Sequence, residues 1–250
     1  MNPRTATILL LALAPLAAAE PPFHVYVPSP KTKQLWSIKA TPSTSGLQLD
    51  VESRTDLSFQ AHTISTHPTQ PILFIGSAGG PVNHAPAATV TLSPSGAVEN
   101  VLPFELKHGT AYLSTDKTGR FLLSADYGSG AIDAYKIDGT TPTWVDGRDE
   151  GRKNAHCILI SPDNRSLYIP YVKEANGLLQ YHFDPSTGSI KPMAKTNALP
   201  PEGTGPRHMA YHPSLPVVYF SNEQHLGVSV YDRDSDGSLS FRRACEAVSK

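Results

Sequence analysis

Three side chains in the second half of the chain have the types and spacing needed for acid–base chemistry. His156 and Arg207 each stand six residues before a proline, Pro162 and Pro213, and Glu223 follows Arg207 by sixteen residues. An imidazole or a carboxylate can activate water as a general base. A guanidinium can stabilise an oxyanion or bind a carboxylate or phosphate with two hydrogen bonds. Each residue also has a structural interpretation, His156 as a hydrogen-bonded histidine and Arg207 with Glu223 as a salt bridge.

The elements that must position these residues belong to a segment that the chain repeats four times. Each copy reads as strand, tight turn, strand. The copies align on four turn residues spaced by 48, 46 and 51 positions, namely Pro68, Asp116, Pro162 and Pro213. A period in the forties made of short strands is typical of a β-propeller with one four-stranded sheet per blade. Equal positions in two repeats place His156 and Arg207 at the same end of the propeller axis, with Glu223 ending the next strand.

The second half of each repeat alternates apolar and polar residues and then enters a turn that contains glycine. Examples are residues 35–39, 88–92, 178–183 and 228–231, with a further Asp-Gly turn at residues 138–139. Such alternation predicts one buried face per strand. We therefore expect an all-β propeller of four-stranded antiparallel blades, with opening strands over residues 23–39 and about five blades. Residues 242–250 contain no strand suited to closing the ring.

Composition and charge restrict the class of protein. The chain has 250 residues, enough to bury a substantial core. Its formal net charge is −1, and a nucleic-acid-binding surface would normally be basic. The 18 Gly and 23 Pro indicate a turn-rich protein, as many hairpins require. We expect no nucleic-acid partner.

The N-terminal nineteen residues have the pattern of a secretory signal. Arg4 is followed by an apolar stretch over residues 8–16 and by three alanines that precede Glu20. This stretch is too short to span a bilayer comfortably. We expect residues 1–19 to be cleaved and residues 20–250 to form a periplasmic or secreted propeller domain without a membrane span.

Cysteines and other histidines are weaker candidates for chemistry. Cys157 lies in an apolar strand, so we expect a buried free thiol rather than a disulfide with Cys245. His208 and His212 have the spacing of a helical metal motif, but four residues of a strand span about 13 Å. Residues 232–237 resemble the start of a calcium loop, yet its twelfth position is Arg243, so a solvated turn is favoured. We expect no metal and no cofactor.

Several segments resemble a known family. Residues 156–170, 203–213 and 219–223 resemble the seven-bladed β-propeller lactonase family, and so do residues 113–116, 119–121 and 125–127. This family includes one class of 6-phosphogluconolactonase and the fungal carboxymuconate lactonizing enzymes. The stretch Gly-Pro-Arg-His-Met around Arg207, with Asn-Glu sixteen residues after the arginine, is the most specific part. The similarity covers roughly residues 23–241 and implies two further blades beyond the five expected here.

The resemblance also implies a site on the propeller axis. His156, Arg207 and Glu223 would be catalytic. The expected substrate-binding residues are His208, Asn222 and Tyr127. As the neighbour of Arg207 in a strand, however, His208 should point the opposite way. The chain departs from the family at residues 128–130, where Gly-Ser-Gly follows the tyrosine that many members follow with asparagine, and at Tyr112, where some members have histidine.

Three functions are consistent with this pattern. The first is metal-independent hydrolysis of a sugar lactone, 6-phosphogluconolactone or a related aldonolactone, with Arg207 on the anionic group or the oxyanion. The second is lactone formation from an unsaturated diacid, as in the muconate branch. The third is a secreted propeller that binds a ligand or protein without catalysis, because fold does not determine function. Convergence of His156, Arg207 and Glu223 on one accessible site separates the catalytic hypotheses from the third.

Overall fold

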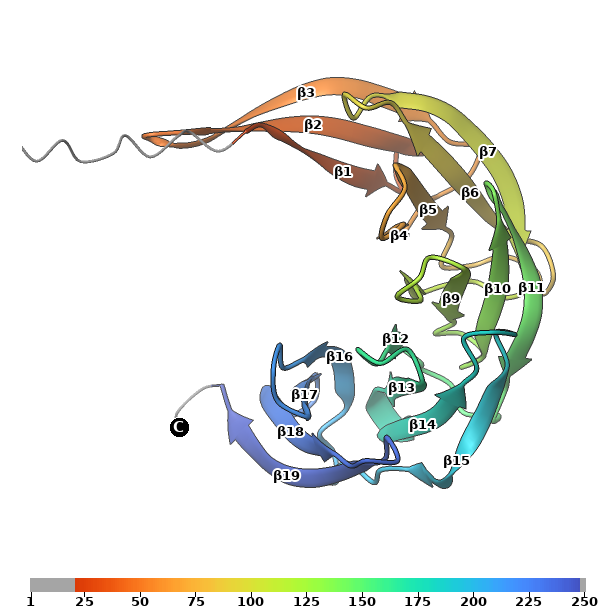
Figure 1. Cartoon of the computed structure of the whole chain (residues 1–250), viewed down its shortest axis with the longest axis vertical. Helices are drawn as coiled ribbons and strands as arrows, with labels where there is room; N and C mark the ends of the chain where they lie inside the picture. The colour runs from red at the N-terminus through yellow and green to blue at the C-terminus, as the bar shows by residue number, and fades with distance from the viewer. Residues whose placement is uncertain (1–20, 248–250) are drawn as a thin grey trace, which may run out of the picture.

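The structure is a computed structural model that describes residues 21–247, and the predicted signal segment lies outside these residues. Five antiparallel sheets follow one another in chain order along an open arc (Figure 1). The first sheet has three strands, β1 (Phe23–Ser29), β2 (Gln34–Ser43) and β3 (Gly46–Asp56). The expected all-β propeller with about five blades is therefore confirmed, and the opening strands continue well beyond residue 39.

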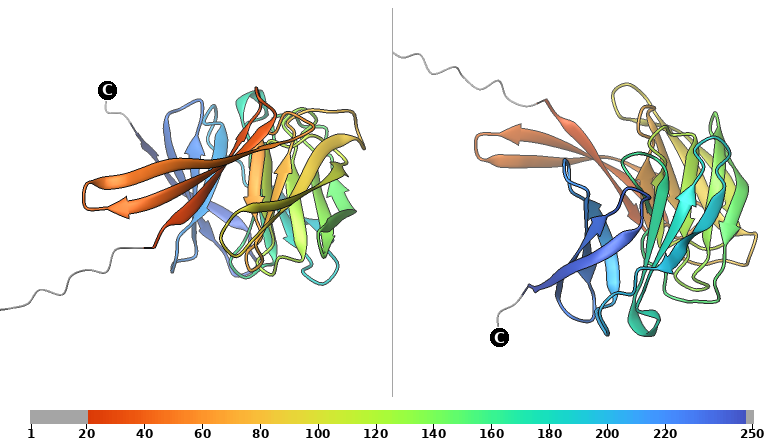
Figure 2. Two further views of the ribbon diagram at one scale, coloured as in Figure 1. Left: turned by 90° about the horizontal axis from the view of Figure 1, so that it is seen from above. Right: turned by 60° about the horizontal axis from the view of Figure 1, so that its bottom comes forward.

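The other four sheets each have four strands in sequential order. They are β4–β7 (Thr63–Thr66, Ile72–Gly76, Ala85–Leu92, Val98–Leu106), β8–β11 (Tyr112–Thr115, Phe121–Ala125, Ile132–Asp138, Thr141–Arg148), β12–β15 (Leu159–Ile160, Ser166–Tyr171, Gly177–Phe183, Ile190–Asn197) and β16–β19 (Pro206–Tyr211, Val217–Asn222, Gly227–Arg233, Leu239–Glu246). In Figure 1 the first strand of each sheet lies on the inside of the arc and the fourth on the outside. Figure 2 shows the β2–β3 hairpin projecting beyond the other sheets.

Apolar side chains pack between neighbouring sheets rather than in one central core. Separate buried clusters join the first sheet to the second, the second to the third, the third to the fourth and the fourth to the fifth. The central strands β5, β9 and β13 are consequently buried at every residue. The expectation of a single buried face was made for the alternating strands. It is wrong for β14, six of whose seven residues are buried, because each inner sheet is covered on both sides by its neighbours.

The turn that follows the innermost strand is held by a side-chain acceptor at its start in each of the four-stranded sheets. One side chain accepts hydrogen bonds from backbone N–H groups further along the turn. His67 Nδ1 accepts from Thr69 and Gln70, and His212 Nδ1 accepts from Ser214 and Leu215. In the other two turns the acceptor belongs to Asp116 or Ser161.

These acceptors correct the alignment of the repeats. The equivalent residues are His67, Asp116, Ser161 and His212, so Asp116 matches the histidine of the second sheet rather than Pro68. The spacings become 49, 45 and 51 residues. His156 and Arg207 keep equal positions, five residues before their acceptors.

Helical structure is minimal in residues 21–247. The described part contains one 3₁₀ turn, η1 (Lys173–Ala175), in the connection from β13 to β14. No helix there is long and apolar enough to cross a bilayer.

Candidate active site

The three predicted catalytic residues come from two neighbouring sheets. His156 precedes β12, and its backbone N–H donates to Pro170 O on β13 at 3.0 Å. Arg207 is the second residue of β16, and Glu223 immediately follows β17. The Glu223 N–H donates to Gly205 O at 2.8 Å. These backbone bonds hold the start of β16 beside the end of β17 and bring Arg207 next to Glu223.

The side chains of these residues meet at the Arg207 guanidinium. Arg207 Nε–H donates to His156 Nε2 at 3.0 Å, and the same Nε lies 3.0 Å from Glu223 Oε2. Within the described residues, neither terminal nitrogen of Arg207 has a hydrogen-bond partner. The Arg207 side chain is 44% exposed and that of Glu223 is 30% exposed. Nε therefore fixes the guanidinium in place, while its two NH₂ groups remain available to an anion from solvent.

His208 lies in the same cluster, which corrects the expected orientation. Its ring centroid is 4.8 Å from that of His156, and the two rings are nearly perpendicular. The pairing of β16 with β17 shifts register between Pro206 and Met209. A register shift of this kind adds a residue to one strand and re-aims its side chains. Consequently Arg207 and His208 are both exposed, although strict alternation would place them on opposite faces.

The two remaining predicted binding residues have different positions. The Tyr127 ring meets His156 edge-on with centroids 5.9 Å apart, so Tyr127 belongs to the cluster. Asn222 is buried, and its Oδ1 accepts a hydrogen bond from Ser229 Oγ at 3.0 Å. Its side chain is directed into the fifth sheet. Asn222 therefore supports β17 and does not reach the group around Arg207.

Electrostatics keep the two histidines neutral near pH 7. Burial lowers the pKa of His156, and the positive charge of Arg207 and the nearby His208 lower it further. Burial and Arg207 also lower the pKa of His208. Because Arg207 Nε–H donates to Nε2 of His156, the ring proton is assigned to Nδ1. This buried atom has no hydrogen-bond partner among residues 21–247. The single lone pair of His156 Nε2 is therefore occupied by the Arg207 Nε–H.

Gln224 supports the cluster from one side, and it was not identified from the sequence. Gln224 Nε2 donates to Glu223 Oε1 at 3.0 Å, and Gln224 Oε1 accepts from the backbone N–H of Lys173 at 3.0 Å. Gly205 has a φ of +58°, and an added Cβ would lie 1.4 Å from Gln224 Oε1. The sequence Gly203-Thr204-Gly205 could have indicated this close contact, because glycine permits both a positive φ and the close approach of another residue.

The weaker candidates do not assemble into a second site. Among the described residues, no three metal-ligating side chains come together. Cys157 is buried and Cys245 exposed, both as free thiols, which confirms the expected buried free thiol at Cys157. Residues 234–237 form the predicted turn, closed by a bond from Gly237 N–H to Asp234 O at 2.9 Å.

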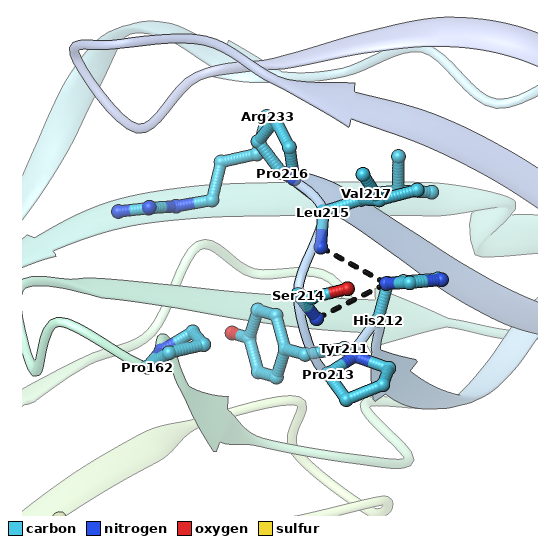
Figure 3. A pocket seen from close by; sticks show the side chains of 9 residues that line it. All are labelled: Pro162, Tyr211, His212, Pro213, Ser214, Leu215, Pro216, Val217 and Arg233. Atoms are coloured by element: carbon cyan, nitrogen blue, oxygen red, sulfur yellow. Dashed lines mark hydrogen bonds between the residues drawn. The ribbon is translucent and has the colours of Figure 1, made fainter.

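The turn between β16 and β17 forms a separate pocket of about 210 Å³ (Figure 3). Tyr211, Pro213 and Arg233 line it together with the His212 ring, whose Nδ1 accepts the two backbone bonds of the turn. This turn follows the end of β16 opposite to Arg207. The pocket is therefore distinct from the cluster around the guanidinium.

Comparisons with known proteins agree with the fold. A family model described as lactonase, seven-bladed β-propeller, matches residues 26–249. The 6-phosphogluconolactonase of Cronobacter sakazakii is 31% identical over 214 residues, which cover 83% of this chain and 60% of that protein. The Yersinia pestis protein of the same name is 30% identical over 220 residues, 85% of this chain and 61% of the relative. The chain thus spans about 60% of the length of these curated relatives.

Solved structures show the same fold at low sequence identity. The periplasmic gluconolactonase of Pseudomonas aeruginosa superposes with a TM-score of 0.78 at 16% identity, over 92% of this chain and 69% of that one. A structure titled a putative 6-phosphogluconolactonase, from Bacteroides fragilis, gives 0.74 at 14% identity, over 91% and 67%. At this identity the likeness extends to the fold alone.

Proposed function

The chain belongs to the seven-bladed β-propeller lactonase family, and from this premise we propose that it hydrolyses a sugar lactone to the open-chain hydroxy acid. The observation that carries the proposal is the meeting of His156 and Glu223 at one guanidinium, whose two terminal NH₂ groups bind no other residue among 21–247. If Arg207 and Glu223 formed only a structural salt bridge, the Arg207 Nε–H would not need the neutral His156 as a second acceptor. The named relatives catalyse this class of reaction on 6-phosphogluconolactone.

In this proposal, each residue has a separate role. Water adds to the lactone carbonyl, a base removes its proton, and the ring C–O bond breaks as the ring oxygen takes up a proton. The NH₂ groups of Arg207 stabilise the oxyanion of the tetrahedral intermediate. Glu223 is the base, because its carboxylate keeps free lone pairs beyond its contacts with Arg207 and Gln224. His156 holds the guanidinium toward the carbonyl, because the Arg207 Nε–H occupies the single lone pair of His156 Nε2.

The experiment compares lactone turnover by the unaltered protein with that of R207A. Base release at constant pH is followed with glucono-1,5-lactone and its 6-phosphate, after subtraction of spontaneous hydrolysis. Loss of one oxyanion donor typically lowers kcat by about 10²–10³-fold, and we expect a loss of that order. R242A is the matched control, since Arg242 is an exposed arginine paired with Asp232 away from the cluster.

Two results would contradict the proposal. One is turnover by R207A equal to that of the unaltered protein. The other is a folded, monodisperse protein without turnover above the spontaneous rate. That second result would favour a propeller that binds its ligand without catalysis.

We also propose that the protein acts in the periplasm or outside the cell. The pattern of residues 1–19 supports this, and so does the fold shared with a periplasmic gluconolactonase. A lactone that reaches that compartment is then the substrate.

A further inference from the structure

Lys173 occupies an unusual backbone conformation next to the proposed active site. It begins η1 with a φ of +56°, a left-handed conformation that residues with a Cβ seldom adopt. Such conformations persist where the surroundings impose them, and they concentrate at functional sites. Here the Lys173 N–H is bound to Gln224 Oε1, and Lys173 O accepts from Asn176 N–H at 3.0 Å.

This conformation directs the Lys173 side chain toward the cluster. Its Nζ lies 5.5 Å from the centroid of the Tyr127 ring, which itself rests edge-on against His156. The contact with Tyr127 raises the pKa of Lys173, and the charges of Glu174 and then Glu223 add to this effect. Tyr127 therefore connects a second cation to the group around Arg207.

The Lys173 ammonium is available for a ligand. It is exposed, and it forms no ion pair within residues 21–247. An unpaired ammonium held by the backbone at the edge of a site is suited to a second anionic group of the same ligand.

We propose that Lys173 is a specificity-determining residue that binds the phosphate of a phosphorylated sugar lactone. This inference rests on the proposed lactonase function. Of the two roles considered for Arg207, it then stabilises the oxyanion at the reacting carbonyl, while Lys173 binds the anionic group. A neutral aldonolactone would leave Lys173 unused, so the site favours the phosphorylated substrate class.

The test measures binding of the two reaction products by calorimetry, because it does not require turnover. Gluconate and 6-phosphogluconate share the carboxylate formed at the carbonyl carbon, but only the second has a phosphate. The unaltered protein is expected to bind 6-phosphogluconate more tightly. K173M is expected to reduce that preference by about 10–100-fold, the range of a charge-assisted hydrogen bond, and K173R is expected to retain most of it.

Controls separate this role from a general effect of charge or folding. R207M is expected to weaken both products together, because both have the carboxylate. K136M removes an exposed lysine of β10 and should leave the preference intact. Added NaCl should also reduce the preference in the unaltered protein, a measurement that needs no variant.

The outcomes distinguish this inference from the proposed function. Equal affinity for the two products, or an equal loss of both in K173M, overturns the role of Lys173 even if lactones are hydrolysed. A phosphate preference that depends on Lys173 supports the role even if the protein hydrolyses no lactone. In that case only the proposed function fails.

Discussion

Replacing Gly205 with alanine tests whether Gln224 links the two sheets of the site. The new Cβ would lie 1.4 Å from Gln224 Oε1. That atom is the far end of a flexible side chain, so Gln224 can move aside without a shift of the backbone. It would then lose its bond to the Lys173 N–H and its contact with Glu223 Oε1.

The expected cost has two parts. A left-handed φ costs a residue with a Cβ about 1–2 kcal/mol, and each lost hydrogen bond costs about 1 kcal/mol. G203A is the matched control, because Gly203 has a φ of +67° and its Cβ would meet only His225, at 3.9 Å. G203A should therefore lose only the first part. G205A should be less stable than G203A by about 1–2 kcal/mol.

Urea unfolding followed by tryptophan fluorescence measures this difference. The same pair of variants in a Q224A background should differ by much less, because the contact is already absent there. We also expect G205A, but not G203A, to weaken the preference for 6-phosphogluconate. Equal stability of G205A and G203A in the unaltered background would refute the reasoning, since Gln224 would then contribute nothing.

Two further predictions concern charge and processing. The hydrogen bond to buried Asp133 raises the pKa of His108 above its unfolded value, so its stabilising contribution is complete below about pH 6.5 and is lost as pH rises through the folded pKa. The difference in free energy of unfolding between the unaltered protein and H108Q should decrease across that window, and a difference that grows with pH would contradict the assignment. N-terminal sequencing of protein recovered from a periplasmic extract should begin at Glu20, whereas recovery only from the cytosol with Met1 retained would exclude export.

The fold was predictable because its information is local and repeated. The turn residues and alternating strands recur every 45 to 51 positions, which is sufficient to identify blades. The burial of both faces of β14 was not predictable from alternation. It depends on packing between sheets, which no single repeat contains.

The site was predictable only in part. Equal positions in the repeats placed His156 and Arg207 together, as the structure has them. The position of His208 depends on a register shift between Pro206 and Met209, and the strand period alone does not predict it. Asn222 lies outside the cluster because the alternation of side chains is kept there. Next to Glu223 in the chain, its amide is directed the other way, toward Ser229.

The backbone conformation of Lys173 could not be predicted from its neighbours in the sequence. Its backbone conformation is held by Gln224, fifty-one residues further along the chain. Only the folded structure brings them together.

The turns after the innermost strands show what each repeat must conserve. Histidine, aspartate and serine all serve there, because the turn requires only an acceptor atom at the correct distance from two N–H groups. Each residue type does so through different N–H groups, those two and three residues further on for the histidines and those four and five residues further on for Ser161. Repeats can therefore diverge until little identity remains while their shapes still superpose. Comparing such blades by hydrogen-bonding capacity should reveal a common descent that comparison by residue identity would miss.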